Sequence, residues 1–318
     1  MDRYHGGLML FGHTRKKKMT YQLRGILALL VVTLVWGTTF PAMKALTADL
    51  SPAWIVFTRF ALAALLLSPF LLRGARSDMR AGLLLGLLLF FCYVFQVEGL
   101  NLTSSNRNAF ICGLNVLIVP LLGILAGKPP ERRIWVALAL AVGGLGALCW
   151  DGGAWSFGDT LALGAALCFG LYIKMMEVHT RGAARLMTIT ATQIATVALC
   201  SAVWLLVTEV PFDGAAAGRY WAKVSASLSA GAFNIVYLGV VATAAIISLQ
   251  TWGQSHSSAN EAAVIYAFEP AAAAFFAFFW LGETMTARGW IGAALLISGM
   301  IVSQWNSERR PAAALVPE

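Results

Sequence analysis

Ten long apolar segments follow one another along this chain of 318 residues, and short polar stretches separate them. A helix needs about 20 apolar residues to cross a bilayer, where it satisfies its own backbone hydrogen bonds. Each segment is long enough for one crossing, so the sequence predicts an all-α membrane protein with ten transmembrane helices. The segments cover residues 25–46, 53–72, 81–100, 108–126, 134–150, 159–178, 186–208, 229–250, 260–281 and 288–305.

The amino-acid composition excludes several classes of protein. Hydrophobic residues make up 59% of the chain and charged residues only 12%, about half the charged share of a soluble domain. A soluble enzyme, a disordered chain and a fibrous repeat are therefore excluded. The five cysteines all lie inside apolar segments, and their spacing fits neither a metal site nor a disulfide framework. We therefore expect no metal, no cofactor and no disulfides.

The positions of lysine and arginine predict how the chain crosses the membrane. With the N-terminus in the cytoplasm, 16 of these residues fall in cytoplasmic segments and 4 in external loops. Cytoplasmic loops of membrane proteins are enriched in Lys and Arg. We therefore expect a multi-pass protein of the cytoplasmic (inner) membrane with both termini in the cytoplasm. The same distribution accounts for the net charge of +8 without a nucleic-acid partner.

The two halves of the chain repeat each other weakly. An offset of 133 positions aligns Trp36-Gly37 with Phe169-Gly170, and an offset of 154 aligns Gln96 with Gln250. Each repeat has five predicted spans, and because this number is odd the second copy enters the membrane upside down. Inverted repeats are typical of secondary transporters, whose substrate site lies near the midplane between the halves. The sequence therefore predicts two inverted five-helix repeats.

The repeats divide the chain into four parts. The first repeat covers residues 19–152 and the second residues 153–306, and residues 307–318 form a cytoplasmic tail. Residues 1–18 are polar and basic at their end, so we expect a disordered and dispensable cytoplasmic extension. Met19 is a candidate alternative start of translation.

Short motifs occur along the chain in a definite order: Trp36-Gly37-Thr38-Thr39-Phe40, Arg59, Thr103-Ser104-Ser105-Asn106, Gly113 to Pro120, Glu269-Pro270 and Leu281-Gly282-Glu283. In this order, over about residues 20–305, they resemble the EamA-type ten-helix transporters of the drug/metabolite transporter superfamily. The resemblance implies EamA-like repeats and export of amino acids or other small metabolites by alternating access. It also implies a central cavity surrounded by the first, third, fourth, sixth, eighth and ninth helices. After Pro120 the first repeat departs from the family pattern, because it reads Gly127-Lys128-Pro129-Pro130.

Uncharged polar and aromatic residues of the predicted spans are candidates for the wall of this cavity. Asn108 and Asn115 are seven residues apart and share one helix face, and Gln96 and Gln250 are equivalent in the two repeats. Aromatic walls with a few amide groups suit a small amphipathic solute. Each aromatic residue taken alone is also explained by ordinary contact with lipid or core. The candidate cavity residues are Trp36, Gln96, Asn108, Asn115, Tyr172, Gln250 and Tyr266.

Glu269 is the deepest charged residue, near the middle of the ninth predicted span and next to Pro270. A buried carboxyl beside a helix kink can bind a cation or carry a proton, so Glu269 is the candidate for coupling. The alternative is a protonated carboxyl that hydrogen-bonds a neighbouring helix. Arg59 is expected to pack against an acidic or carbonyl partner, and contact with the substrate is the alternative. Lys174 and Glu177, three residues apart, are expected to form an intrahelical ion pair.

The sequence therefore predicts a secondary transporter, an exporter of amino acids or other small amphipathic metabolites. Its expected partners are the solute, the lipid bilayer and a proton or cation, and it is expected to be a monomer or a homodimer. The alternatives are a facilitative carrier or an importer of another small metabolite. An intramembrane enzyme is less favoured, because neither HExxH nor GxSxG occurs and every histidine lies in a terminus or a connection: His5, His13, His179 and His256.

Overall fold

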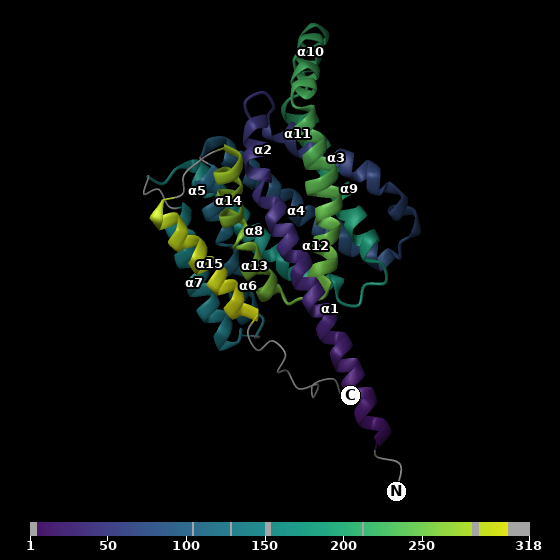
Figure 1. The fold of residues 1–318 in the computed structure, drawn as a ribbon. Coiled ribbons are helices and arrows are strands. Elements are labelled where there is room, and N and C mark those ends of the chain that lie inside the picture. The colour runs from purple at the N-terminus through teal and green to yellow at the C-terminus, as the bar shows by residue number, and fades with distance from the viewer. Residues whose placement is uncertain are drawn as a thin grey trace.

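This computed structural model describes residues 5–103, 105–127, 129–149, 154–211, 213–281 and 286–304. Within these ranges the regular secondary structure is entirely helical (Figure 1). The first half contains α1 (His5–Gly37), α2 (Thr39–Leu46), α3 (Pro52–Leu67), η1 (Ser68–Arg73), α4 (Arg76–Leu102), α5 (Ser105–Gly113), α6 (Asn115–Leu125) and α7 (Arg132–Cys149). The second half contains α8 (Phe157–Thr180), α9 (Leu186–Thr208), α10 (Gly214–Ala230), α11 (Ala232–Val236), the π-helix η2 (Tyr237–Ala245), α12 (Ile246–Ser255), α13 (Ala259–Tyr266), α14 (Glu269–Leu281) and α15 (Ala287–Gln304).

Seven helices, or runs of consecutive helices, are long and apolar enough to cross a membrane. Their ends agree within five residues with seven of the segments predicted from the sequence, and the shorter apolar helix Ala287–Ser303 coincides with the last segment. The chain is therefore a multi-pass helical membrane protein, as predicted. The seven are Tyr21–Leu46, Pro52–Leu71, Arg76–Leu102, Arg107–Leu125, Phe157–Thr180, Leu186–Thr208 and Ala232–Ser255.

Large apolar side chains cover the outside of these helices. Leu65 on α3 is 71% exposed, and Leu199 and Val207 on α9 are 67% and 75% exposed. The interior, in contrast, holds polar side chains such as Arg59 and Gln193. A large exposed apolar surface is unusual for a soluble monomer, whereas lipid tails cover such a surface without cost. The distribution of side chains thus agrees with the hydropathy of the sequence.

Glycines set the closest contacts between helices. A Cβ atom added to Gly86 on α4 would lie 2.6 Å from Cβ of Thr196 and 2.7 Å from the carbonyl oxygen of Gln193 on α9. Gly82, one turn earlier, faces the same helix, so these two glycines permit close packing of α4 against α9. On another side of the bundle, α7 and α15 pack along each other (Figure 1).

Two stretches are helical where the sequence predicted no helix. Residues 209–228 were assigned to an external loop, but residues 214–230 form α10, which projects from the rest of the bundle (Figure 1). Asp213 caps α10, because its carboxylate accepts a hydrogen bond from Ala216 N at 3.1 Å. We expected residues 1–18 to be disordered. Instead, α1 begins at His5 and includes most of them. The tail 307–318 lies outside the described residues.

Gly37 occupies the contact between α1 and α14, so a side chain there is expected to separate the two helices. Its added Cβ would lie 2.8 Å from Ala273 N and 2.9 Å from Cβ of Ala272. We expect Gly37→Val to destabilise the fold by about 1–3 kcal/mol, measured as a lower Tm in detergent. Gly143→Val on α7 is the matched control, because a Cβ there meets no atom within 4 Å. Equal Tm values for the two variants would contradict this packing.

Candidate functional site: a cavity where three helices are interrupted

Three of the helical spans are interrupted in their middle. α1 gives way to α2 at Thr38, α5 to α6 at Leu114, and α13 to α14 at residues 267–268. Pro41 and Pro270 follow two of these interruptions. Proline has no N–H group and clashes with the carbonyl four residues earlier, so each position favours a kink or a break in the helix. Within a membrane, interrupted helices persist only where protein or a water-filled cavity surrounds them.

Local hydrogen bonds satisfy part of the backbone that the interruptions leave free. Both N and Oγ1 of Thr38 donate to the carbonyl oxygen of Val35, at 3.1 and 2.6 Å. Oγ1 of Thr39 donates to the carbonyl oxygen of Trp36 at 2.8 Å. The Thr38 hydroxyl also hydrogen-bonds the hydroxyl of Tyr237 at the start of η2. The motif Trp36-Gly37-Thr38-Thr39-Phe40 therefore builds the interruption of the first span.

All three interruptions border one cavity. The cavity is narrow: its volume, counted as room for the centres of water molecules, is about 40 Å³, where one water needs about 10–15 Å³. A solute larger than a few waters therefore requires the helices to move apart. The lining residues are Trp36, Thr39, Phe40, Tyr93, Gln96, Ala109, Cys112, Gly113, Asn115, Phe169, Ile173, Gln250, Tyr266, Glu269 and Pro270.

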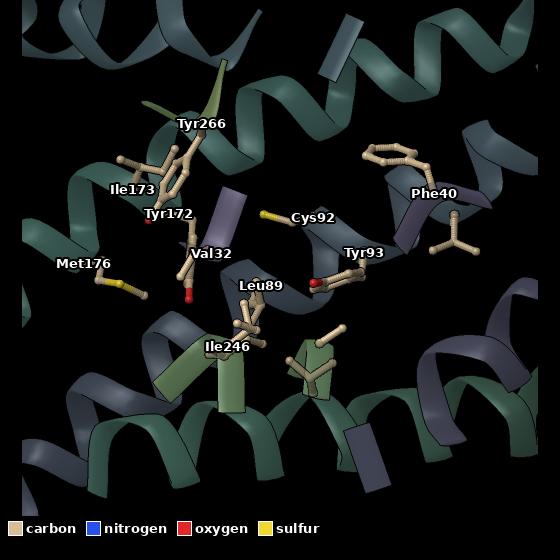
Figure 2. Close-up of a cluster of buried hydrophobic side chains, with 14 of the residues drawn as sticks. Val32, Phe40, Leu89, Cys92, Tyr93, Tyr172, Ile173, Met176, Ile246 and Tyr266 are labelled. Atoms are coloured by element: carbon tan, nitrogen blue, oxygen red, sulfur yellow. The ribbon is translucent and has the colours of Figure 1, made fainter. Parts of the chain in front are cut away.

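Two pairs of aromatic rings form much of the cavity wall. Trp36 on α1 and Tyr266 on α13 have ring centroids 5.5 Å apart. Tyr93 on α4 and Phe169 on α8 are edge to face, with centroids 6.1 Å apart. Figure 2 shows Tyr93 and Tyr266 among the buried side chains of this region. Aromatic walls offer apolar contact to a solute, and the edges and faces of the rings also interact with polar groups.

Three buried polar atoms of the lining have no hydrogen-bond partner among the described residues. They are Trp36 Nε1, Asn115 Oδ1 and Gln250 Oε1. Buried polar groups are nearly always hydrogen-bonded, to protein or to water, because leaving them unpaired costs free energy. Donors and acceptors that converge unpaired on one cavity are typical of a site that binds water or a polar solute.

Glu269 is the charged residue of the lining, and it is the first residue of α14. A carboxylate is stabilised at this position by the partial positive charge of the helix N-terminus. Among the described residues, no ion pair involves Glu269. We expected a kink next to Pro270, but the helix is fully interrupted there. The carboxyl group of Glu269 therefore lies at the start of α14.

Five of the seven predicted cavity residues line the cavity, together with Glu269, and two do not. Asn108 is fully buried between helices, where its Nδ2 donates to the carbonyl oxygen of Gln96 at 3.3 Å. Tyr172 instead faces α9, and its hydroxyl donates to Gln193 Oε1 at 3.0 Å. Asn108 and Tyr172 therefore lie outside this lining, because neither a shared helix face nor the equivalence of two helices fixes which side chain reaches the cavity.

The structure adds lining residues that the sequence reasoning missed. Tyr93 lies three residues before Gln96 on the same face of α4, which is a signal that could have identified it. Phe169 is the residue that the offset of 133 aligns with Trp36, so repeat equivalence indicated Phe169 rather than Tyr172. Thr39, Phe40 and Cys112 lie beside the interruptions, which the sequence did not reveal at Thr38 and Leu114.

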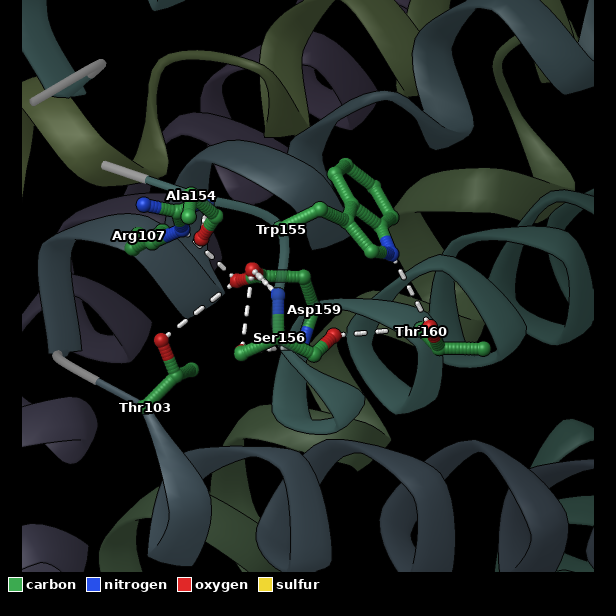
Figure 3. Close-up of polar contacts among 7 residues, drawn as sticks. All are labelled: Thr103, Arg107, Ala154, Trp155, Ser156, Asp159 and Thr160. Atoms are coloured by element: carbon green, nitrogen blue, oxygen red, sulfur yellow. Dashed lines mark hydrogen bonds and ion pairs between the residues drawn. The ribbon is translucent and has the colours of Figure 1, made fainter. Parts of the chain in front are cut away.

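A buried ion pair joins α5 to the start of α8 (Figure 3). Arg107 Nε lies 2.7 Å from Asp159 Oδ1, and the two side chains are 7% and 0% exposed. Asp159 also accepts from Ser156 N at 2.7 Å and closes a capping box at the N-terminus of α8. Arg107 Nη2 donates to the carbonyl oxygen of Ala154 at 2.9 Å. The sequence placed Arg107 in an external loop and gave no sign of this pair.

Partners of three further charged residues were predicted from the sequence. Lys174 Nζ lies 2.7 Å from Glu177 Oε2, which confirms the intrahelical pair, and Arg181 joins it at 2.8 Å. The expectation for Arg59 was wrong, because its Nε donates at 2.9 Å to the hydroxyl of Thr243 rather than to an acidic or carbonyl group.

Comparisons with known proteins agree with this arrangement. The model of the EamA-like transporter family matches residues 23–149 and again residues 156–304. Two relatives from Archaeoglobus fulgidus are each described as an uncharacterized transporter. One is 28% identical to this chain, and the match covers 87% of this chain and 84% of the relative. The other is 22% identical, and the match covers 78% of this chain and 85% of the relative. A crystal structure, described only as that of a protein, superposes with a TM-score of 0.68 over 90% of this chain and 96% of the other. At 17% identity this likeness concerns the fold alone.

Proposed function

The chain belongs to the EamA-like transporter family, and on this premise we propose that it exports amino acids or other small amphipathic metabolites by alternating access. Family and relatives make it a membrane transporter and not an enzyme. The observation that carries the proposal is the cavity at the three helix interruptions, with its unpaired polar atoms. Interrupted helices beside a site near the membrane midplane are typical of secondary transporters.

The chemistry of the lining supports a small amphipathic solute. Aromatic rings supply apolar contact, and amide groups such as those of Asn115 and Gln250 hydrogen-bond polar atoms. No lysine or arginine belongs to the lining within the described part of the chain. Solutes such as sugar phosphates, which proteins bind through Arg and Lys clusters, therefore fit this cavity less well than amino acids.

Ten spans in two inverted repeats of five are part of the proposal. The family model matches the chain twice, once in each half, which supports the division into residues 19–152 and 153–306. Lining residues come from both halves, as expected for a site between the repeats. We also propose that both termini are cytoplasmic, in the inner membrane, and that the protein is a monomer or a homodimer.

Topology reporters test the ten-span arrangement. Fusions after Asp49, Asp151 and Asp213 are expected to report the outside of the cytoplasmic membrane, because 16 lysines and arginines lie in the segments assigned to the inside and only 4 outside. Paired phosphatase and fluorescent-protein fusions give opposite signals on the two sides. A cytoplasmic signal at two of the three positions would overturn the arrangement.

Uptake into proteoliposomes tests the transport activity itself. A carrier is expected to show uptake of a radiolabelled amino acid that saturates with concentration, whereas a channel gives a rate that keeps rising in proportion. Candidate solutes follow from a thermal-shift screen against amino acids, sugars and nucleotides, since a bound ligand raises the apparent stability by mass action. Absence of saturable uptake for every solute that raises the Tm would refute the proposal.

We propose that Glu269 couples transport to a proton or a cation. Glu269→Gln keeps the shape of the side chain and removes its charge, so uptake is expected to lose its dependence on an imposed pH or cation gradient. Glu98→Gln, a half-buried glutamate of α4 outside the lining, is the matched control. If wild-type uptake ignores both gradients, the alternative of a facilitative carrier holds. If uptake occurs only when the solute gradient is directed into the vesicles, the alternative of an importer holds.

A further inference from the structure

Arg59 is a fully buried cation beside the wall of the cavity. It lies on α3 within a predicted span, and it is 1% exposed. Within the described residues no carboxylate forms an ion pair with it. A cation inside the hydrocarbon region costs at least a few kcal/mol, and burial without a counter-charge leaves most of its field unscreened. The positive charge therefore acts on whatever lies next to it.

Hydrogen bonds hold the guanidinium in one orientation. Nε donates to Oγ1 of Thr243 at 2.9 Å, and Nη1 lies 3.3 Å from Sδ of Met43 on α2. Thr243 belongs to the π-helix η2 and donates in turn to the carbonyl oxygen of Leu238 at 2.7 Å. π-Helical turns occur frequently at functional sites. Nη2 has no hydrogen-bond partner among the described residues, so these contacts do not use the full capacity of the group.

Tyr93 connects Arg59 to the cavity. The guanidinium carbon lies 4.7 Å from the centroid of the Tyr93 ring, which is cation–π distance. Tyr93 lines the cavity together with Glu269, the charged residue of the lining. The cavity thus has a carboxyl group at the start of α14, and a buried guanidinium contacts the ring of Tyr93 outside the lining. A carboxyl group in the lining and a cation next to it match a solute that carries both an ammonium and a carboxylate.

We infer that Arg59, acting through Tyr93, is a positioning residue that makes the cavity accept a solute carboxylate although the carboxyl group of Glu269 lies in the same lining. The inference deepens the proposed function and rests on it. Without Arg59, an ionised Glu269 would favour cationic amines and repel carboxylates. With Arg59 in place, the carboxylate of an amino acid is directed toward Tyr93 and its ammonium toward Glu269.

The rate at which charged reagents modify a thiol in the cavity measures this field without any knowledge of the solute. The Asn115→Cys substitution, in a background where the five native cysteines are replaced by alanine, places a thiol on the lining. It reacts with anionic sulfonatoethyl or cationic trimethylammonioethyl methanethiosulfonate. The rate constant for the anionic reagent is divided by that for the cationic reagent. This anion-to-cation ratio, compared with the ratio for Asn101→Cys on the exposed end of α4, reports the potential in the cavity.

We expect Arg59→Gln to lower this anion-to-cation ratio by about tenfold or more, and Arg59→Lys to leave it within about twofold. A merely structural Arg59 would change expression or Tm in both variants and leave the ratio unchanged, which would overturn the inference. If Arg59→Gln does not fold, the test uses the anion-to-cation ratio of the Asn115→Cys protein that retains Arg59. Its ratio is expected to exceed that of the exposed control, and a ratio below the control would show that Glu269 dominates and refute the inference. Reaction of neither reagent would contradict the proposed function, because the cavity would then never open to water.

Discussion

Replacing Arg107 by leucine is expected to lower the free energy of unfolding by about 3–5 kcal/mol, because the Asp159 carboxylate then stays buried without its cation. The two charges lie 2.7 Å apart, and Asp159 is 0% exposed. Asp159 keeps its hydrogen bonds to Ser156 N and Oγ, but these compensate a full charge only in part. The loss is therefore expected to rank among the largest of any single substitution in the chain.

Thermal unfolding in detergent measures this effect, with Arg219→Leu on α10 as the matched control. Arg219 is exposed, and surface charges contribute little to stability, so its replacement is expected to leave the Tm nearly unchanged. Asp159→Asn, which removes the charge and keeps the shape, is expected to fall between the two. Equal Tm values for Arg107→Leu and Arg219→Leu would mean that the pair does not hold α5 to α8.

Replacing Asn115 or Gln250 by leucine is expected to lower kcat/KM for the transported solute by about 5- to 150-fold in each case. Both residues place an unpaired carbonyl oxygen at the cavity. A lost hydrogen bond that leaves the solute's donor buried and unpaired costs about 1–3 kcal/mol, and 1.4 kcal/mol corresponds to a factor of ten. Leucine has a similar size, so the packing around the cavity is expected to survive.

Uptake into proteoliposomes, normalised to the amount of protein, provides the comparison. Asn101→Leu is the matched control, because Asn101 lies exposed at the end of α4 and outside the lining. The cavity variants are expected to keep the wild-type Tm within a few degrees, so that a loss of transport does not reflect unfolding. Wild-type rates in both cavity variants would exclude Asn115 and Gln250 from the solute site.

Hydropathy and spacing predicted the spans because the bilayer imposes a length and an apolar character on every crossing helix. The ends of the seven long spans therefore agree with the structure within five residues. The pair Lys174–Glu177 was equally accessible, since residues three apart on a helix are neighbours. These features depend on local sequence, and local sequence is sufficient for them.

The helix interruptions were only partly visible in the sequence. Pro270 indicated a break in its span, but nothing at Leu114 distinguishes the end of α5 from the middle of a helix. Leu114 N donates instead to the carbonyl oxygen of Ile111 at 3.1 Å, a tightening that tertiary packing imposes. The π-helix η2 is likewise an adjustment to packing, and Thr243 within it receives the hydrogen bond of Arg59.

Contacts between distant segments account for the remaining differences. Arg107 and Asp159 are 52 residues apart, and Arg59 and Thr243 are 184 apart, so no local pattern predicts either contact. The same reason explains Tyr172, which bonds Gln193 on α9 while the adjacent Ile173 reaches the cavity. A rotation of one position along a helix moves a side chain by about 100°, and only the packed structure fixes it.

The most direct measurement is an experimental structure of the protein with its transported solute bound, identified first by the thermal-shift screen. Density for the solute is predicted in the cavity between the interruptions, against Trp36, Asn115 and Tyr266, with its polar atoms within hydrogen-bond distance of Asn115 and Gln250. Solute density elsewhere with this cavity closed and dry, for example in the apolar groove lined by Phe90 and Trp204 between α4 and α9, would contradict it.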